Sequence, residues 1–358
     1  MRVYHLSHTD LDGYGCQVVT KHYFKNVEFF NSNYGREIEA KFDEIISLID
    51  SRDEKSLVLV TDLNLTLGQC EKFETALNER DSKILLLDHH QTGLECAKNF
   101  GWYLLDNSRC ATKITYDFFS KAYGSDEKLS KFVDVVNAVD IWIKEDANFE
   151  MGKVCMGIVS GAKEINKIMF DETSREYIFH LLKEAESYFY EDGGHIKLDD
   201  TLHQLKKGYF LDGNDDTLSN LVSNFVVKKL SDEREKFEIN YLDKKGVLTY
   251  NIGNTSVIGN DFLVANPDID FFIDATSRKT MSFRANGKVD VSQMAKHLIG
   301  GGGHVNASGG LFMGFKDDYS YEPIKAQIVE LIEKKTAELE NEKAENNLDK
   351  NKGDENAK

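Results

Sequence analysis

The sequence predicts an α/β protein with a mainly parallel, helix-flanked sheet in its N-terminal domain, a helical connector and a smaller α/β domain at the C-terminal side. Over the first 150 residues, short β-rich apolar runs alternate with helical segments, which is the order expected of an open parallel sheet with helices on both faces. Residues 161–240 are mostly helical and charged, and strand-like runs return from about Val247. The alternating N-terminal pattern, the helical middle segment and the return of strand-like runs together indicate two domains joined by a connector.

The elements of the N-terminal domain follow from the spacing of its apolar residues. Helices are expected over about 15–24, 38–50 and 68–78, where small or apolar residues recur at helical intervals. Strands are expected at four short and nearly continuous apolar runs, which are RVYHLS, VEFFN, SLVLVTD and KILLLDHH.

The C-terminal part returns to strands. Four runs predict them, which are VLTYNIG, TSVIG, DFFIDAT and KTMSFRA. VDVSQMAKHLI has helical spacing, with Asp290 as its N-cap. We expect a first domain over 1–160, a connector that completes it over 161–240, a second domain over 241–322, and a charged helix with a disordered tail over 323–358.

The composition excludes several classes of protein. The net charge of −17 speaks against a protein that coats nucleic acid by bulk electrostatics. Residues 271–316 are locally basic, with six bases and two acids, and this predicts a site for an anionic ligand. No apolar run is long enough to span a membrane, no signal peptide is visible, and the five scattered cysteines include no C-x-x-C. We therefore expect a cytoplasmic protein with no membrane partner.

Acids and histidines follow three of the predicted strands. The residues are His8, Asp10 and Asp12 after the first, Asp62 after another, and Asp88, His89 and His90 at the end of a third. The carboxyl ends of parallel strands meet at one edge of a sheet, where crowded carboxylates repel one another. A pair of divalent cations would neutralise them, and mixed oxygen and nitrogen ligands suit Mn²⁺ or a similar metal better than Ca²⁺. Asp140, in the apolar stretch FVDVVNAVDIW, also needs a partner that a metal would supply.

Each motif alone also fits a simpler role. D-x-D-G is often a turn, and an aspartate after a strand, such as Asp62, is often a helix cap. The first motif imitates the start of an EF-hand loop, but Tyr14 and Lys21 stand where two ligands are required. The joint occurrence of the motifs at strand ends favours the metal site.

Taken together, H-x-D-x-D, a strand-end Asp, D-H-H and a later isolated Asp resemble the DHH phosphoesterase superfamily. GGGGH followed by A-S-G resembles the accessory DHHA1 domain that accompanies it in RecJ and in the nanoRNase (oligoribonuclease) group. SHTDLDGYGC and AVDIW are most similar to the branch of the nanoRNase B type. The likeness covers about residues 1–145 and 245–315, and it implies a DHH catalytic domain followed by a DHHA1 substrate-binding domain.

The resemblance implies a role for each of these residues. One Mn²⁺ ion would be bound by His8 and Asp10, a second by Asp12, His89 and Asp140, and both by Asp62. Mg²⁺ or Co²⁺ would be possible substitutes. Asp88 and His90 would be catalytic, because Asp88 would orient an imidazole and His90 would face the scissile phosphate.

The glycine run before His304 is not a P-loop, because no Lys-Ser/Thr follows it and no strand precedes it. A flexible connector is the simpler reading. The resemblance to DHHA1 instead implies a grip on the substrate phosphate by Arg284 and His304, with exposed backbone N–H groups of the glycines beside them. The candidate substrate-binding residues are Arg284, Gly301, Gly302, Gly303, His304, Asn306 and Ser308, with Ser282 as a further candidate.

The favoured function is a Mn²⁺-dependent phosphodiesterase or exonuclease that releases mononucleotides from short single-stranded RNA or linear dinucleotides. The same metals would serve a phosphatase of 3′-phosphoadenosine 5′-phosphate or a cyclic (di)nucleotide phosphodiesterase. A non-enzymatic nucleotide sensor is disfavoured because every expected ligand position is occupied. Residues 161–240 would form a linker, a lid or the surface of a homodimer.

Overall fold

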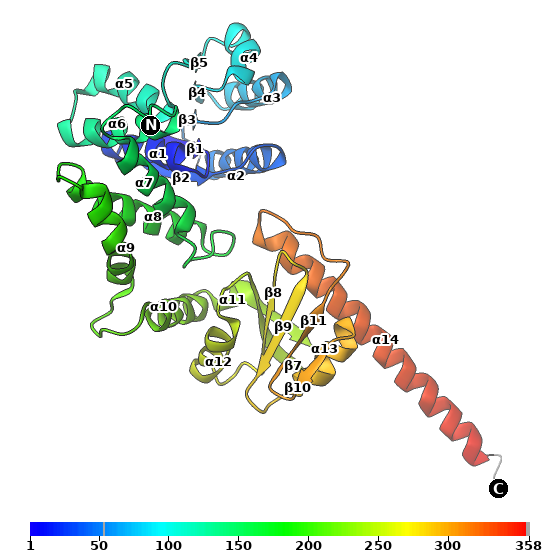
Figure 1. The fold of residues 1–358 in the computed structure, drawn as a ribbon. Helices are drawn as coiled ribbons and strands as arrows, with labels where there is room; N and C mark the ends of the chain where they lie inside the picture. Colours follow the sequence, from blue (N-terminus) through cyan, green and yellow to red (C-terminus); the bar gives the residue numbers. More distant parts are fainter. Residues whose placement is uncertain (53, 356–358) are drawn as a thin grey trace. The chain divides into compact units, whose positions relative to one another are not determined.

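The computed structural model describes residues 1–52 and 54–355, with side chains described as far as Asn341. The chain forms two compact units (Figure 1). The first unit comprises Met1–Lys163 and Arg175–Tyr209, and the second comprises Glu164–Ser174 and Phe210–Lys358. Each unit is built around its own sheet.

The first unit contains a five-stranded parallel sheet with the order β2-β1-β3-β4-β5. Its strands are β1 (Arg2–Ser7), β2 (Val27–Asn31), β3 (Ser56–Thr61), β4 (Lys83–Asp88) and β5 (Tyr103–Leu105). The predicted α/β class with a parallel sheet is therefore confirmed. Because all strands run the same way, their carboxyl ends lie along one edge.

Helices cover both faces of this sheet (Figure 1). One face is covered by α1 (Leu11–Tyr23) and α5 (Ala111–Tyr123), and the other by α2 (Arg36–Arg52) and α3 (Leu67–Asn78). The remaining helices from Gln91 to Phe210 are η1 (Gln91–Gly93), α4 (Leu94–Asn99), α6 (Glu127–Asp140), α7 (Phe149–Gly161), α8 (Asp171–Ala185), η2 (Glu186–Tyr188) and α9 (Gly194–Phe210).

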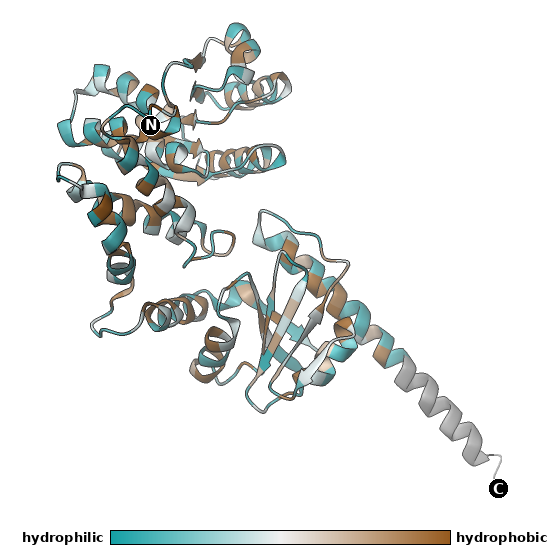
Figure 2. Cartoon of the chain, viewed as in Figure 1, coloured by the Kyte–Doolittle hydropathy of each residue, from teal (hydrophilic) through white to brown (hydrophobic). Residues whose placement is uncertain are grey.

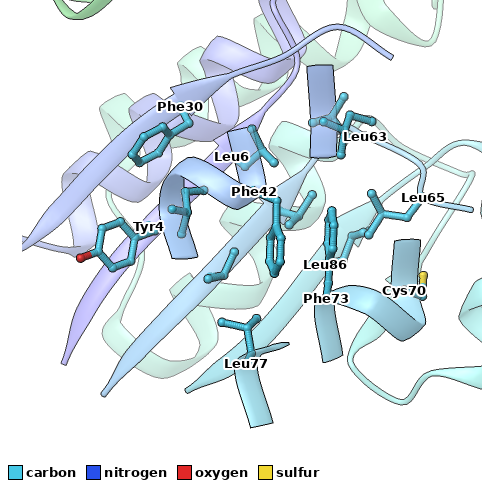
Figure 3. Close-up of a cluster of buried hydrophobic side chains, with 14 of the residues drawn as sticks. Tyr4, Leu6, Phe30, Phe42, Leu63, Leu65, Cys70, Phe73, Leu77 and Leu86 are labelled. Carbon is cyan, nitrogen blue, oxygen red and sulfur yellow. The ribbon is translucent and has the colours of Figure 1, made fainter. Parts of the chain in front are cut away.

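The core between the sheet and α2 and α3 is closely packed (Figure 3). The rings of Phe42 and Phe73 stack with their centroids 3.6 Å apart, and Leu6 and Leu86 of the strands are fully buried beside them. Figure 2 shows hydrophobic and hydrophilic residues alternating along α2 and α3, as expected of helices with one buried face. This core makes the sheet a rigid support for the loops at its edge.

The second unit contains a six-stranded mixed sheet with the order β10-β11-β9-β8-β7-β6, in which β7 and β8 are the parallel pair. Its strands are β6 (Glu238–Tyr241), β7 (Lys244–Tyr250), β8 (Phe271–Ala275), β9 (Thr280–Ala285), β10 (Gly302–His304) and β11 (Ala307–Leu311). Its helices are α10 (Leu218–Asp232), α11 (Arg234–Phe237), α12 (Thr255–Ala265), α13 (Val291–Ile299) and α14 (Tyr321–Glu355). Asp290 caps α13 as predicted, since its side chain accepts from the backbone N–H groups of Ser292 and Gln293.

The strand predicted at TSVIG is wrong, because this segment begins α12. Asn254 caps the helix by accepting from the N–H of Val257, and Ile258 and Phe262 bury one face at helical spacing. The parallel pairing of β7 and β8 also requires a crossover, which α12 supplies.

Two helices extend further than their sequence patterns indicate. α1 begins at Leu11 and not near Gly15, so Asp10 is its N-cap and Asp12 lies in its first turn. α14 continues to Glu355 and thus covers most of the segment for which a disordered tail is expected. Residues 356–358 of that segment lie outside the described residues.

Candidate active site

The candidate site lies in the first unit, at the carboxyl edge of its sheet. His8 follows β1, Asp62 follows β3, and Asp88 ends β4 with His89 directly after it. Because β1, β3 and β4 are neighbours in the sheet, these side chains come from adjacent loops. The helices supply the rest of the site, since α1 carries Asp12 in its first turn and α6 ends at Asp140.

One group of possible metal ligands consists of His8, Asp10 and Asp62. The Nδ1 atom of His8 lies 2.9 Å from Oδ2 of Asp10 and 3.8 Å from Oδ2 of Asp62. Asp10 also accepts a 3.0 Å hydrogen bond from the N–H of Gly13. The N-cap of α1 is thereby fixed next to the imidazole.

A second group surrounds His89. Its Nε2 atom lies 3.4 Å from Oδ1 of Asp62, 3.7 Å from Oδ2 of Asp12 and 3.7 Å from Oδ2 of Asp140. Asp62 therefore presents one carboxylate oxygen to each group. The structure brings together the six residues expected to bind metal. His90 also forms a possible ligand group with Asp62 and His89, although it is expected to be catalytic.

The positions of Asp62 and Asp12 are set by the backbone. Asp62 has a φ of 55°, a left-handed conformation that aspartate adopts more readily than most residues. Asp12 is fully buried and accepts 2.8 Å hydrogen bonds from the N–H groups of Ala111 and Thr112 at the start of α5. These N–H groups are among those that a helix leaves unpaired at its first turn.

The electrostatics of the site favour a bound cation. Burial raises the pKa of Asp62 well above its usual range, and the charges of Asp12 and Asp10 raise it further. Burial followed by the charges of Asp12 and Asp10 raises the pKa of Asp140 to about 9. The Oδ2 atoms of Asp62 and Asp140 are buried and have no hydrogen-bond donor. Carboxylates in this state need either protons or metal ions, so the donor set fits divalent cations.

Asp88 is fully buried and contacts the site through hydrogen bonds. Its Oδ1 accepts from the N–H of His89 at 2.8 Å and lies 2.7 Å from Nδ1 of His90. Its Oδ2 accepts a 2.8 Å bond from the hydroxyl of Tyr103. The bond to Asp88 raises the pKa of His90. The Nε2 atom of His90 lies 3.0 Å from the hydroxyl of Tyr34.

Sequence reasoning missed three residues near the site. The ring of Tyr34 lies 4.9 Å from that of His8, and its place just after β2 at the same sheet edge was a usable signal. Tyr103 and Cys110 gave none, because their roles depend on the packing of β5 and α5. The Sγ atom of Cys110 forms a third possible ligand group with Asp12 and Asp140, and it also accepts from the N–H of Lys113 at the start of α5.

In the second unit, the candidate phosphate-binding residues lie on the β9–β11–β10 part of the sheet. Arg284 pairs with Ala307, which pairs with His304, so the two side chains share one face. The Nη2 atom of Arg284 donates a 2.9 Å bond to Ser256. Ser282, two residues before Arg284 on β9, pairs with Gly309.

The other candidates in this unit have structural partners. Ser308 is buried and donates a 2.6 Å bond to the carbonyl of Val291, and Oδ1 of Asn306 accepts from the N–H of Gly287. A Cβ atom at Gly301 would lie 2.4 Å from the carbonyl oxygen of Gly309, and Gly303 has a φ of 150°. Gly302 lies between them in β10. These glycines therefore allow β10 to pair closely with β11.

The chain is similar to several known proteins. The model of the DHH family, N-terminal domain, matches residues 2–138. A 3′,5′-cyclic-nucleotide phosphodiesterase of Helicobacter pylori is 43% identical over 93% of this chain and 99% of its own length. Oligoribonuclease NrnB of Bacillus subtilis is 26% identical over 86% of this chain and 72% of its own length. A crystal structure of an uncharacterized protein from Helicobacter pylori G27 superposes with a TM-score of 0.84 at 42% identity, over 93% of this chain and 99% of that one.

The fold, the carboxylate and histidine site and these relatives define a hydrolase that acts on phosphoester bonds, with a donor set that fits divalent metal ions. More specifically, the chain belongs to the DHH family. Among the helices of the described residues, none is both long enough and apolar enough to span a bilayer.

Proposed function

We propose that this chain hydrolyses 3′,5′-cyclic nucleotides to nucleoside monophosphates with the help of two divalent cations, preferably Mn²⁺. The arrangement of Asp62 carries the proposal, because its two oxygens face two separate ligand groups. The choice of substrate is supported by the relative from Helicobacter pylori, which is similar over nearly the whole of both chains.

In this proposal, His8 and Asp10 would hold one cation, Asp12, His89 and Asp140 would hold the other, and Asp62 would contribute to both sites. When bound, such cations lower the pKa of water and polarise a phosphoryl oxygen.

Asp88 keeps Nδ1 of His90 in a hydrogen bond, so Nε2 is the ring nitrogen that would contact the phosphate. The hydroxyl of Tyr34 is hydrogen-bonded to this Nε2 atom, and this bond would break or be shared with the phosphate when substrate binds. In the second unit, Arg284 and His304 remain the proposed contacts to the rest of the substrate, with Gly301, Gly302, Gly303 and Asn306 around them. Ser308 is the weakest member of that set, because its hydroxyl already bonds within the unit.

The test is turnover of 3′,5′-cyclic AMP and 3′,5′-cyclic GMP by the purified full chain with Mn²⁺, Mg²⁺ or Co²⁺, followed by chromatography of the products. We expect a nucleoside monophosphate with wild type in Mn²⁺, and its loss with Asp62→Asn. Cyclic nucleotide that binds and is never cleaved in any of these metals would contradict the proposal and favour a sensor.

A second candidate is the hydrolysis of short oligoribonucleotides. It is supported by the similarity to oligoribonuclease NrnB and by the excess of bases in residues 271–316 of the second unit. A 5′-labelled ladder of two to five nucleotides, assayed beside the cyclic nucleotides and 3′-phosphoadenosine 5′-phosphate, ranks the substrates by kcat/KM. Neutralising Arg284 should lower kcat/KM for oligonucleotides more than for cyclic nucleotides if the longer substrates are the natural ones. Sedimentation of the same sample tests the predicted homodimer.

A further inference from the structure

The first unit contains a cavity of about 340 Å³ that has no part in the proposed chemistry. It is lined by the C-terminal half of α1, the N-terminal half of α6, and α8 with the residue that follows it. The apolar wall consists of Val18, Leu129, Phe132, Phe179 and Leu182. Its volume lies within the range of about 300–1,000 Å³ that is typical of small-molecule sites.

The charged residues around this wall leave two ammonium groups without a carboxylate. Lys183 pairs with Glu186 at 2.6 Å, and the carboxylate of Asp126 accepts from the N–H of Leu129 as the cap of α6. Lys21 lies over the ring of Phe179, with Nζ 4.8 Å from the ring centroid, and Lys128 has no carboxylate within 4 Å among the described residues. In a chain with 61 acidic and 44 basic residues, two such groups at one apolar cavity favour an anionic ligand.

We propose that this cavity binds a small amphipathic anion, which is a molecule with one apolar ring or chain and one phosphate, sulfonate or carboxylate group. The apolar part would lie against Phe132 and Leu182, where burial of its surface favours binding. The anionic group would lie between Lys21 and Lys128. A neutral molecule of the same size would leave both ammonium groups uncompensated and should bind more weakly.

The cavity is joined to the metal centre by two helices. α1 carries the candidate ligand Asp12 in its first turn and lines the cavity with Lys21, about 14 Å further along the helix axis. α6 lines the cavity with Leu129 and ends at the candidate ligand Asp140, about 17 Å away. A ligand that shifts either helix along its axis therefore shifts a carboxylate of the group around His89. By linkage, occupation of the cavity should change the affinity of the centre for cations, and cations should change the affinity for the ligand by the same factor.

The binding test uses the full chain and the fluorescence of 1-anilinonaphthalene-8-sulfonate. Decanoate and adenosine 5′-monophosphate serve as competitors, because they distinguish an aliphatic carboxylate from an aromatic phosphate. Since Lys21 and Lys128 are exposed, the double variant Lys21→Gln/Lys128→Gln should fold normally. We expect it to bind the probe at least tenfold more weakly than wild type, whereas Lys98→Gln, an exposed lysine of α4, should bind it as wild type does. Equal affinity in the double variant and wild type would overturn the site.

The linkage test measures free Mn²⁺ by electron paramagnetic resonance, with and without saturating decanoate, because adenosine 5′-monophosphate would be a product of the proposed reaction. We expect the dissociation constant for Mn²⁺ to change at least threefold in wild type and not in the double variant. An unchanged constant in wild type would overturn the connection through α1 and α6. Both measurements are made without substrate, so their outcome is independent of whether cyclic nucleotides are hydrolysed.

Discussion

Asp62 in the first unit and Asp274 in the second are buried to the same extent, with 2% of each side chain exposed, yet their surroundings are opposite. Asp274 accepts hydrogen bonds from the hydroxyls of Thr249 and Thr255 and from the N–H of Ile252. One oxygen of Asp62 has no donor, and its charged neighbours are other carboxylates. A buried carboxylate that accepts hydrogen bonds from its neighbours has a structural role. A buried carboxylate that lacks donors and lies beside like charges indicates that the site binds a ligand from outside the chain.

The largest effect on activity is expected from substitution of Asp62. Asp62→Asn should lower kcat by about 10³-fold or more, because the metal contribution to such reactions is several kcal/mol. The same change should raise the melting temperature of the metal-free protein, since it removes repulsion with Asp12 and Asp10. Asp81→Asn is the matched control, because Asp81 also has a positive φ (50°) and belongs to no ligand group. A metal-free Asp62→Asn variant that melts below wild type would contradict this account of the repulsion.

A smaller loss is expected from the hydrogen bonds behind the site. Tyr103→Phe removes the hydroxyl that donates to Oδ2 of Asp88 and should lower activity or metal affinity by about 10–100-fold, as for other residues that orient metal-binding histidines. Steady-state kinetics across Mn²⁺ concentrations measure the effect. Tyr116→Phe removes a buried hydroxyl bonded to the carbonyl of Asp126 and should leave activity unchanged. Equal losses in both variants would indicate general destabilisation.

The buried carboxylate of Asp274 in the second unit should make the free energy of unfolding depend on pH. Burial raises the pKa of Asp274 to about 6, although the bonds from Thr249 and Ile252 oppose the shift. The folded state therefore holds this proton more tightly than the unfolded chain, in which the pKa is about 3.9. The stabilisation of the folded state by this bound proton is fully present below about pH 3.9 and is lost as the pH rises through 6.

Urea unfolding between pH 4 and 8 measures this effect. The free energy of unfolding of wild type should fall with rising pH relative to that of Asp274→Asn. The exposed Asp268→Asn should follow wild type at every pH. Parallel curves for wild type and Asp274→Asn would show that Asp274 titrates at its usual value.

The smallest effect is expected at Cys110. Serine is the better N-cap, so Cys110→Ser should change kcat less than about threefold and stability by less than about 1 kcal/mol. The ratio of activities with Mn²⁺ and Co²⁺ should also stay the same, because the six proposed oxygen and nitrogen ligands would suffice without the thiol. A changed ratio would add Cys110 to the ligands near Asp12 and Asp140.

Much of the first unit could be predicted from sequence because its information is local. Each strand is a short apolar run, and a proposed ligand such as Asp62 or His89 directly follows one. Parallel strands that are neighbours in the sheet therefore bring these residues together. Asp140 was found in a different way, as a charge inside an apolar helix. The resemblance implies a bond from Asp88 to an imidazole, which is seen at His90. Its bond from Tyr103 could not be predicted, because Tyr103 lies on a strand paired in parallel with β4 and faces Asp88 only after folding.

The second unit was predicted less completely. TSVIG has β-branched residues that suggest a strand, but the connection between two parallel strands requires a helix there. The glycine run suggested a phosphate cradle, whereas Gly301 and Gly303 are also required for the close pairing of β10 and β11. Ser308 could not be separated from substrate-facing residues until its bond to Val291 was seen.

The six proposed ligands are spread from residue 8 to residue 140, and this has a consequence during synthesis. A ribosome makes the first aspartates early, but the set is incomplete until α6 has emerged and packed. If the proposed centre binds metal, a nascent chain would lack the full set of ligands, and tight binding of metal would begin only after the N-terminal layers have assembled.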